Sequence, residues 1–240
     1  MYIPKLTSVD DFDKQARTIK DHPLGILFSY SAPKIALTDF LLGDKIDKPV
    51  DSEMCATHVP FFLQKSQDGS CRLVAHLAGK NQQIKLLKEN PSCMVVFQGP
   101  NSYVTPAWYP EKEETHKFVP TWDYSCVHVY GKAKIIEEKE WLLKMLDSLT
   151  DQEENKRPDR DEFESKWKVE QTNQKYLDSL IKGIVGLEIE VSHIQSKLKV
   201  HQNQNPKNVN GVLRGYEMEM GDDTAKQMCK LVRENYPREL

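Results

Sequence analysis

The sequence predicts a mainly β protein with flanking helices, an α+β fold built around one barrel-like sheet. Residues 24–136 carry a succession of apolar runs with strand-like alternation. Residues 137–180 crowd Glu, Lys, Asp and Arg around apolar residues at helical intervals. No repeat or Gly/Ser linker divides the chain. We therefore expect a single domain over residues 1–240, with a helical insertion at about 137–180 and a C-terminal helix at about 222–236.

The N-terminal third is expected to be one helix followed by strands. Ser8, with Asp11 three residues later, resembles a capping box, and the helix should end near His22-Pro23. Four apolar runs then predict strands, the last two of which form a hairpin around a turn at residues 67–70. These runs are GILFSYS, KIALTDFLL, MCATHVPFFLQ and CRLVAHLA.

The remaining elements follow from cap and periodicity signals. Asn81 is expected to cap a short helix over QQIKLLKEN, after which SCMVVFQG resumes strand character. Two or three surface helices should be joined near Arg157-Pro158. A long strand is predicted from Gly183, then a loop through NQNPKNVNG, and a last helix from Asp222 or Asp223.

Composition limits the classes of function. The chain of 240 residues carries 33 Lys and Arg against 36 Asp and Glu, so no excess of basic charge supports binding to nucleic acid. Its five cysteines are widely spaced without a CxxC pair, which argues against a disulfide framework and favours a reducing compartment. No window approaches the roughly 20 apolar residues that span a bilayer. We expect a cytoplasmic protein without membrane contact, with the nucleus as an alternative.

Aromatic side chains gather in two half-polar segments. GPNSYVTPAWYP at 99–110 and VPTWDYSCVHVYG at 119–131 together hold two Trp and four Tyr. An ordinary strand pair does not need this mixture with Gly-Pro and a central proline, so we expect a planar or polar group to be held there.

Two pairs of side chains could carry chemistry, and each has a simpler interpretation. Strand alternation places Cys126 and His128 on one face, as a thiolate and its base would require, although a buried cysteine and a structural histidine give the same pattern. His58 and His76 could ligate a metal or haem iron, but no HxH or HExxH spacing supports this, so no metal site is predicted.

Two further segments could bind an anion. In AHLAGKNQQ at 75–83 a strand ends at a glycine and a lysine before a helix whose backbone N–H groups could be free, which would form an anion cradle. A plain capped turn explains the same residues. KLKVHQNQN at 197–205 suits a polar ring or a phosphate, and equally suits solvent.

Taken together, these segments resemble the PaiB family of FMN-binding negative transcriptional regulators. The resemblance runs from Met1 to about residue 216, and its most specific part is GPNSYVTPAWY followed by VPTWDY. It implies an FMN-binding split β-barrel, related to flavin reductases and pyridoxamine phosphate oxidases. It also implies a homodimer with FMN sites at the subunit interface, where the aromatic surface at Trp108 and Trp122 would be covered.

The resemblance also implies site residues. The strand ATHVP would lie along the isoalloxazine ring and the turn HLAGKN would meet the phosphate. Trp108 and Trp122 would stack near the flavin or wall it, and Gln202 and Asn203 would close the site from the other protomer. The first choices for the flavin are Thr57, His58, His76, Lys80 and Asn81.

The chain departs from the family pattern at four positions. Gly79 stands where the family has a basic residue, with Lys80 one position later. His201 and Gln204 replace Ser and Arg of the late motif, and Asp123 stands in the centre of the WNY signature. A new carboxylate and a lost guanidinium would both oppose a phosphate dianion near them.

The resemblance leaves three functions to compare. The first is FMN binding with weak flavin-dependent oxidoreductase activity, for which no residue is an obvious acid or base. The second is regulation without catalysis, through DNA or a protein partner, although no helix-turn-helix or basic patch is recognisable. The third is haem binding or degradation, which related split barrels perform.

Overall fold

A computed structural model describes residues 1–31 and 54–237. The strand predicted over KIALTDFLL lies outside these residues. The chain forms two compact units whose segments alternate along the sequence. Unit 1 comprises Met1–His22, Phe97–His128 and Gln195–Leu240, and unit 2 comprises Pro23–Val96 and Val129–Ile194. The single domain therefore stays a prediction.

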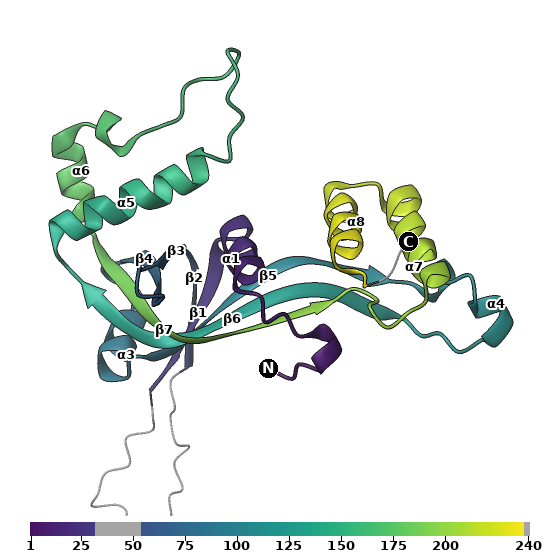
Figure 1. Cartoon of the computed structure of the whole chain (residues 1–240). Helices are drawn as coiled ribbons and strands as arrows, with labels where there is room; N and C mark the ends of the chain where they lie inside the picture. The colour runs from purple at the N-terminus through teal and green to yellow at the C-terminus, as the bar shows by residue number, and fades with distance from the viewer. Residues whose placement is uncertain (32–53, 238–240) are drawn as a thin grey trace, which may run out of the picture. The chain divides into compact units, whose positions relative to one another are not determined.

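Seven strands form one sheet in the order β2-β1-β5-β6-β7-β4-β3 (Figure 1). The strands are β1 (Leu24–Tyr30), β2 (Met54–Pro60), β3 (Phe62–Lys65), β4 (Cys71–Ala78), β5 (Ser92–Val104), β6 (Thr121–Ile136) and β7 (Ile184–Lys199). The α-helices are α1 (Phe12–Asp21), α3 (Gln83–Glu89), α4 (Lys112–Thr115), α5 (Lys139–Glu154), α6 (Gln174–Ile181), α7 (Pro206–Gly215) and α8 (Asp223–Asn235). Shorter helical turns are η1 (Lys5–Thr7), η2 (Pro106–Trp108), η3 (Val169–Gln171) and η4 (Tyr216–Met220).

Unit 2 contains a sheet that curves round on itself. β1 pairs with β2 and β5, and β4 pairs with β3 and β7, all in antiparallel ladders. β2 and β4 are far apart in the strand order, yet they are in contact. A flat sheet cannot bring these strands together, so the sheet closes as a barrel does. Leu27, Leu73 and Leu187 are fully buried in this unit. The curved antiparallel sheet with flanking helices confirms the predicted fold class.

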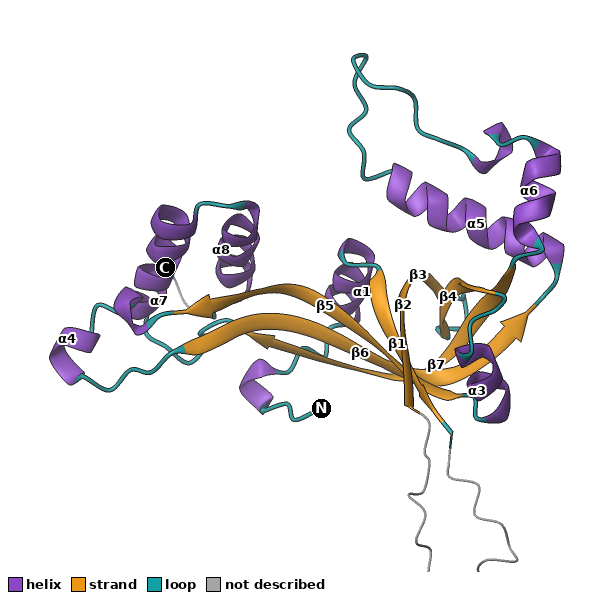
Figure 2. Cartoon of the chain, turned by 180° about the vertical axis from the view of Figure 1, so that it is seen from behind, coloured by secondary structure: helices purple, strands orange, loops and turns teal. Residues whose placement is uncertain are grey.

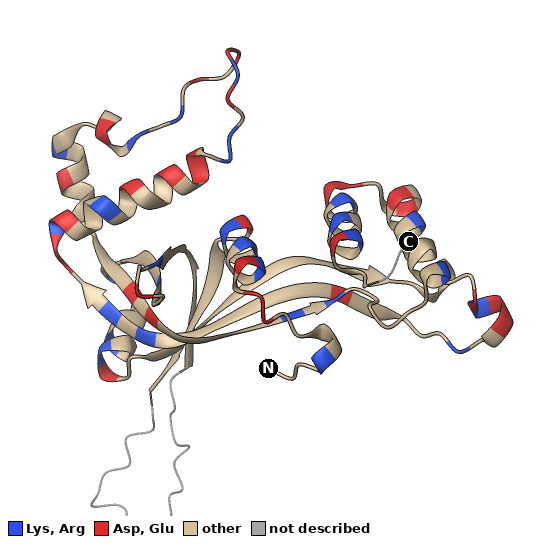
Figure 3. Cartoon of the chain, in the orientation of Figure 1, with Lys and Arg blue, Asp and Glu red and all other residues tan. Residues whose placement is uncertain are grey.

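Two helices of the predicted insertion cover part of this sheet. Leu142 and Met145 of α5 and Leu177 of α6 form a hydrophobic cluster with Val74 of β4. The opposite faces of the helices carry charges of both signs (Figure 3). This separation of apolar and charged faces is why the charged stretch folds as surface helices.

Unit 1 has its own hydrophobic core. α1, α7 and α8 lie on one face of the parts of β5, β6 and β7 that belong to this unit (Figure 2). Val104 of β5 and Leu198 of β7 pack against Val212 of α7 and Met228 of α8. None of the helices in the described residues is both long and apolar enough to cross a membrane.

Three local predictions were wrong. The cap of α1 is Asp11, whose carboxylate accepts from the N–H groups of Asp13 and Lys14, while the Ser8 hydroxyl bonds Asp10 instead. The predicted strand MCATHVPFFLQ is interrupted at Phe61, which separates β2 from β3. The predicted loop NQNPKNVNG begins α7, because an Asn-Pro pair at the N-cap and first position starts a helix.

Candidate flavin site and a buried polar network

The predicted flavin residues of unit 2 come from β2, β4 and the turn after β4. Asn81 Nδ2 donates to Thr57 Oγ1 at 3.3 Å, which joins two of them. Thr57 lies opposite Leu27 and His58 opposite Ile26 in the β1–β2 ladder. Because successive side chains of a strand alternate between faces, Thr57 and His58 point in opposite directions. Thr57 and Asn81 are thus brought together, whereas His58 is exposed on the other face.

His76 of β4 has an open hydrogen-bonding position. Its Nδ1 is buried and has no hydrogen-bond partner among the described residues. Burial lowers the pKa of this imidazole below its ordinary value, which favours the neutral ring. A buried polar nitrogen without a partner costs free energy unless a ligand or water satisfies it. His76 can therefore offer one hydrogen bond to a bound group.

The turn after β4 uses most of the backbone donors that the anion cradle required. The N–H groups of Gln83, Ile84 and Lys85 are bonded to Asn81 and Gln82, so the expectation of free N–H groups at α3 was wrong. Asn81 acts on this helix as predicted, through its side-chain oxygen. Lys80 is exposed and, within residues 1–31 and 54–237, makes no ion pair or hydrogen bond. The turn consequently presents a free ammonium group.

The two tryptophans of unit 1 lie in different environments. Trp108 is 9% exposed and packs edge-on against Tyr216 at 5.1 Å, with Gly211 and Gly215 leaving room for it. The expectation of an aromatic surface at Trp108 was therefore wrong. Trp122 is 51% exposed, donates from Nε1 to Asn101 Oδ1 at 3.0 Å and meets Tyr103 edge-on. Only Trp122 of this pair offers a ring to a ligand from this chain.

Gln202 and Asn203 also differ from one another. The buried Gln202 side chain accepts from the N–H of Val200 at 2.8 Å and donates to the carbonyl of Leu198 at 2.5 Å. It holds the backbone after β7 in place. Asn203 is exposed, and no described residue occupies its amide. Closing a flavin site from a second protomer remains a prediction for both residues.

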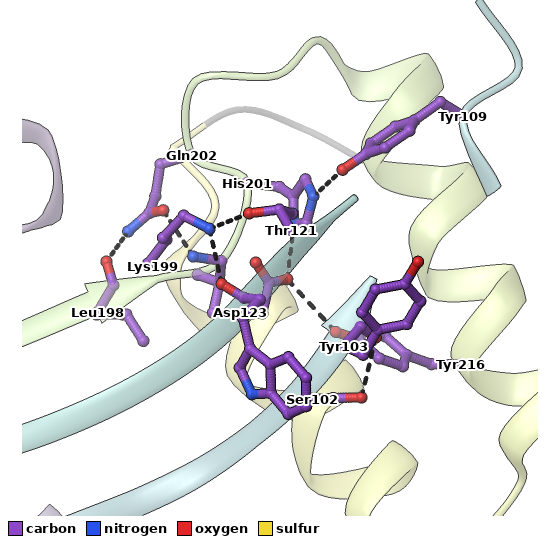
Figure 4. Close-up of polar contacts among 12 residues, drawn as sticks. Ser102, Tyr103, Tyr109, Thr121, Asp123, Leu198, Lys199, His201, Gln202 and Tyr216 are labelled. Carbon is purple, nitrogen blue, oxygen red and sulfur yellow. Dashed lines mark hydrogen bonds and ion pairs between the residues drawn. The ribbon is translucent and has the colours of Figure 1, made fainter. Parts of the chain in front are cut away.

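A chain of hydrogen bonds in unit 1 joins residues that sequence reasoning did not connect (Figure 4). Asp123 is 0% exposed, and its Oδ2 lies 2.6 Å from Nδ1 of His201. His201 Nε2 contacts the hydroxyl of Tyr109, and the Tyr216 hydroxyl donates to Asp123 Oδ2 at 3.4 Å. We call these four residues the Asp123 network. They come from β6, the turn after β7, the segment after η2, and η4.

The protonation of the Asp123 network follows from its burial. Burial, and secondly the charge of Asp123, raise the pKa of Tyr109 and of Tyr216, so both phenols stay protonated. A neutral His201 that carries its proton on Nδ1 donates to Asp123 and accepts from Tyr109. This tautomer satisfies every member except Asp123 Oδ1, which is buried without a partner among the described residues.

Lys199 links the Asp123 network to the surface. Its ammonium donates to the Trp122 carbonyl at 2.7 Å and to the Thr121 hydroxyl (Figure 4). Burial lowers the pKa of Lys199, and the nearby charge of Asp123 opposes that shift. The network itself is buried, so it cannot touch a substrate. It can position Lys199 and the exposed Trp122 ring.

The remaining predicted pairs do not form reactive sites. Burial raises the pKa of the Cys126 thiol and lowers the pKa of His128, which is the opposite of what a thiolate with its imidazolium needs. In the described part of the chain, no group of three His, Cys, Asp or Glu is arranged to hold a metal ion.

Comparison with known proteins identifies the family. The model of the family described as "Putative FMN-binding domain" matches residues 1–193. The chain belongs to this FMN-binding family. An uncharacterized protein of Saccharomyces cerevisiae is 45% identical over 167 residues, which cover 69% of this chain and 98% of the relative. The protease synthase and sporulation protein PAI 2 of Bacillus subtilis is 29% identical over the whole of both chains.

Among solved structures, the FAD and heme binding protein from Mycobacterium smegmatis is similar to this chain. It has a TM-score of 0.48 and 13% sequence identity, with 80% of this chain and 73% of that chain covered.

FMN is the cofactor of this family, and the described residues of unit 2 fit it. The unpartnered Nδ1 of His76 and the free ammonium of Lys80 lie four residues apart on one strand and turn. A neutral hydrogen-bonding ring and a cation are the two kinds of group that a flavin phosphate ester needs. Asp123 does not oppose the phosphate as expected, because its carboxylate is enclosed by His201 and Tyr216.

Proposed function

We propose that this protein binds FMN through unit 2 and acts as a flavin-dependent oxidoreductase. The observation that carries the proposal is the pairing, on β4 and its turn, of an unpartnered buried nitrogen at His76 with an unpaired cation at Lys80. Both lie within the range that the FMN-binding family covers. When bound, FMN supplies hydride and single-electron transfer at its isoalloxazine ring.

Each residue of unit 2 has a separate task in this proposal. Lys80 attracts the phosphate dianion by charge, since an ammonium acts as a point charge for phosphate. His76 stays neutral because burial lowers its pKa, so it can form a hydrogen bond without adding charge. Thr57 and Asn81 hold each other at 3.3 Å and fix the position of the turn relative to β2. His58 offers an exposed imidazole on the other face of β2.

In unit 1, Trp122 supplies an exposed ring that can stack on a planar group. Lys199 donates to the Trp122 carbonyl and thereby holds the backbone beneath that ring. These roles accompany the family expectation of a flavin bound between two protomers. Trp108 and Gln202 support the same unit from its interior.

Comparing FMN with riboflavin tests the role of Lys80, because riboflavin lacks the phosphate. Quenching of flavin fluorescence should show that the wild-type protein prefers FMN. Lys80→Ala should raise the Kd for FMN about tenfold while leaving riboflavin binding unchanged. Lys85→Ala is the matched control, because Lys85 is an exposed lysine of the same segment. Equal affinity of the wild type and Lys80→Ala for FMN would refute the assignment.

Anaerobic reduction distinguishes catalysis from binding alone. If the protein is an oxidoreductase, NADH or NADPH should bleach the visible band of the bound flavin. Bleaching by dithionite alone would favour the regulatory alternative, to which the sporulation name of the Bacillus subtilis relative points. A salt-dependent shift of DNA by the purified protein would then separate direct DNA binding from a partner-mediated route. A Soret band on addition of haemin would identify the haem alternative.

A further inference from the structure

Unit 1 contains a cavity that no part of the flavin proposal uses. It has a volume of about 300 Å³ and lies between α1, α8 and the face of β6 and β7 that these helices cover. Figure 1 shows α1 and α8 standing on the same side of the sheet. The floor and walls supply apolar side chains, chiefly Val127, Leu198 and Leu231. A cavity of this size holds a small ligand with one ring or a short branched chain.

A hydroxyl group without a partner lies in the floor of this cavity. Ser125 of β6 is 7% exposed, and its Oγ makes no hydrogen bond with any residue that the structure describes. Gly99 lies opposite, where a Cβ atom would come within 2.0 Å of this oxygen. The absence of a side chain at Gly99 therefore leaves room at the hydroxyl. A buried hydroxyl that is left open is a hydrogen-bonding position for a ligand.

The mouth of the cavity carries more positive than negative charge. Lys14 and Arg17 line it from α1, and Lys14 Nζ donates to Asn235 Oδ1 at 3.0 Å. The guanidinium of Arg17 is exposed and unpaired among the described residues. Glu234 is the carboxylate of the lining and has Lys230 within 3.9 Å. Figure 3 shows basic residues on α1 at this position. Two cations against one partly neutralised anion favour an acidic ligand.

We propose that this cavity binds a small monocarboxylic acid with a compact apolar body. The carboxylate lies at Arg17, whose planar fork can make two parallel hydrogen bonds to it. The body rests on Val127, Leu198 and Leu231, and a polar group at its far end reaches Ser125. Such a site is separate from the flavin residues of unit 2 and needs no FMN.

Three aromatic probes test the site in the full-length protein by calorimetry. 4-Hydroxybenzoate should bind saturably, benzoate more weakly, and neutral 4-hydroxybenzamide at least about tenfold more weakly than 4-hydroxybenzoate. Arg17→Ala should raise the Kd of both carboxylates about tenfold. Ser125→Ala should weaken 4-hydroxybenzoate and leave benzoate unchanged. Lys20→Ala, a basic residue of α1 outside the cavity lining, is the control and should change nothing.

The same measurements can overturn the proposal. Absence of saturable binding, equal affinity for the amide, or an Arg17→Ala protein that binds both acids normally would each refute it. Arg17 is exposed, so its substitution is not expected to unfold the chain, and circular dichroism checks this. Because riboflavin and FMN are absent from the titration, its failure leaves the flavin proposal untouched.

Discussion

Asp123 and His201 depart from the family pattern at positions 78 residues apart, and their side chains meet at 2.6 Å. A buried carboxylate needs a donor, and a buried imidazole needs an acceptor. Each residue answers the other's requirement, so the two departures form one coupled change. His201 also adopts a left-handed backbone conformation, with φ 65°, that directs its ring at Asp123.

Reverting the pair to Asn and Ser tests this coupling. Asp123→Asn and His201→Ser should each lower the free energy of unfolding by about 2–4 kcal/mol, because each leaves a buried partner unsatisfied. The double variant should lose at least about 1 kcal/mol less than the sum of the two. Urea denaturation of the four proteins measures this difference. Strict additivity would show that the contact does not explain the joint departure.

Single positions were predicted unevenly from the sequence. The role of Asn81 as a cap followed from its place between a strand and a helical pattern, and the structure shows its side chain bonded to Gln83. The Asp123 network was missed because its members are separated by long stretches of chain, and sequence spacing does not report such contacts. One signal could have revealed it, namely two unusual polar residues at positions where the family pattern has others.

At the scale of elements, α7 shows how a cap can be mistaken for a loop. Asn205 Oδ1 accepts from the N–H of Asn208 at 2.9 Å, and Pro206 fills the first helical position. Asn205 Nδ2 also donates to Glu111 at 2.7 Å. This helix carries Val209 and Val212 into the core of unit 1. The residue that starts the helix thus also ties it to the segment after η2.

Two substitutions separate the cap from the contact with Glu111. Asn205→Ser keeps an oxygen that can cap α7 but loses the amide donor, whereas Asn205→Ala loses both. Asn205→Ala should therefore lower the free energy of unfolding by about 1 kcal/mol more than Asn205→Ser. Thermal unfolding followed by circular dichroism compares them. Equal losses would mean that the cap contributes nothing beyond the Glu111 contact.

Strands and helices with regular periodicity were predicted well. β1, β4, β6 and β7 follow their apolar alternation, and α8 begins after Asp222 as its cap residue indicated. The break between β2 and β3 was missed because the apolar run continues through Phe61. Phe61 is fully buried at this break, so tertiary packing rather than local sequence decides it.

At the scale of the whole molecule, two buried histidines link stability to pH. Burial lowers the pKa of His76, and burial followed by the charged amino terminus lowers that of His128, from an ordinary value of 6.5. Between the lowered value and 6.5 the unfolded chain binds more protons than the folded one. Stability from this source is therefore complete above 6.5 and declines as the pH falls through that window.

Substitution by asparagine tests this linkage. A protein with His76→Asn and His128→Asn should lose less stability between neutral and mildly acidic pH than the wild type. The control is His116→Asn, because His116 is exposed and has the left-handed backbone conformation that asparagine tolerates. Denaturant titrations across this pH range measure the slope. An unchanged slope in the double variant would assign the acid sensitivity to other groups.

The most direct test of the whole account is the visible absorbance spectrum of the wild-type protein after incubation with FMN and removal of the free flavin. Membership in the FMN-binding family predicts that the flavin bands remain with the protein. It also predicts that their intensity corresponds to a fixed ratio of FMN to chain. A colourless protein that also fails to quench flavin fluorescence would contradict the account.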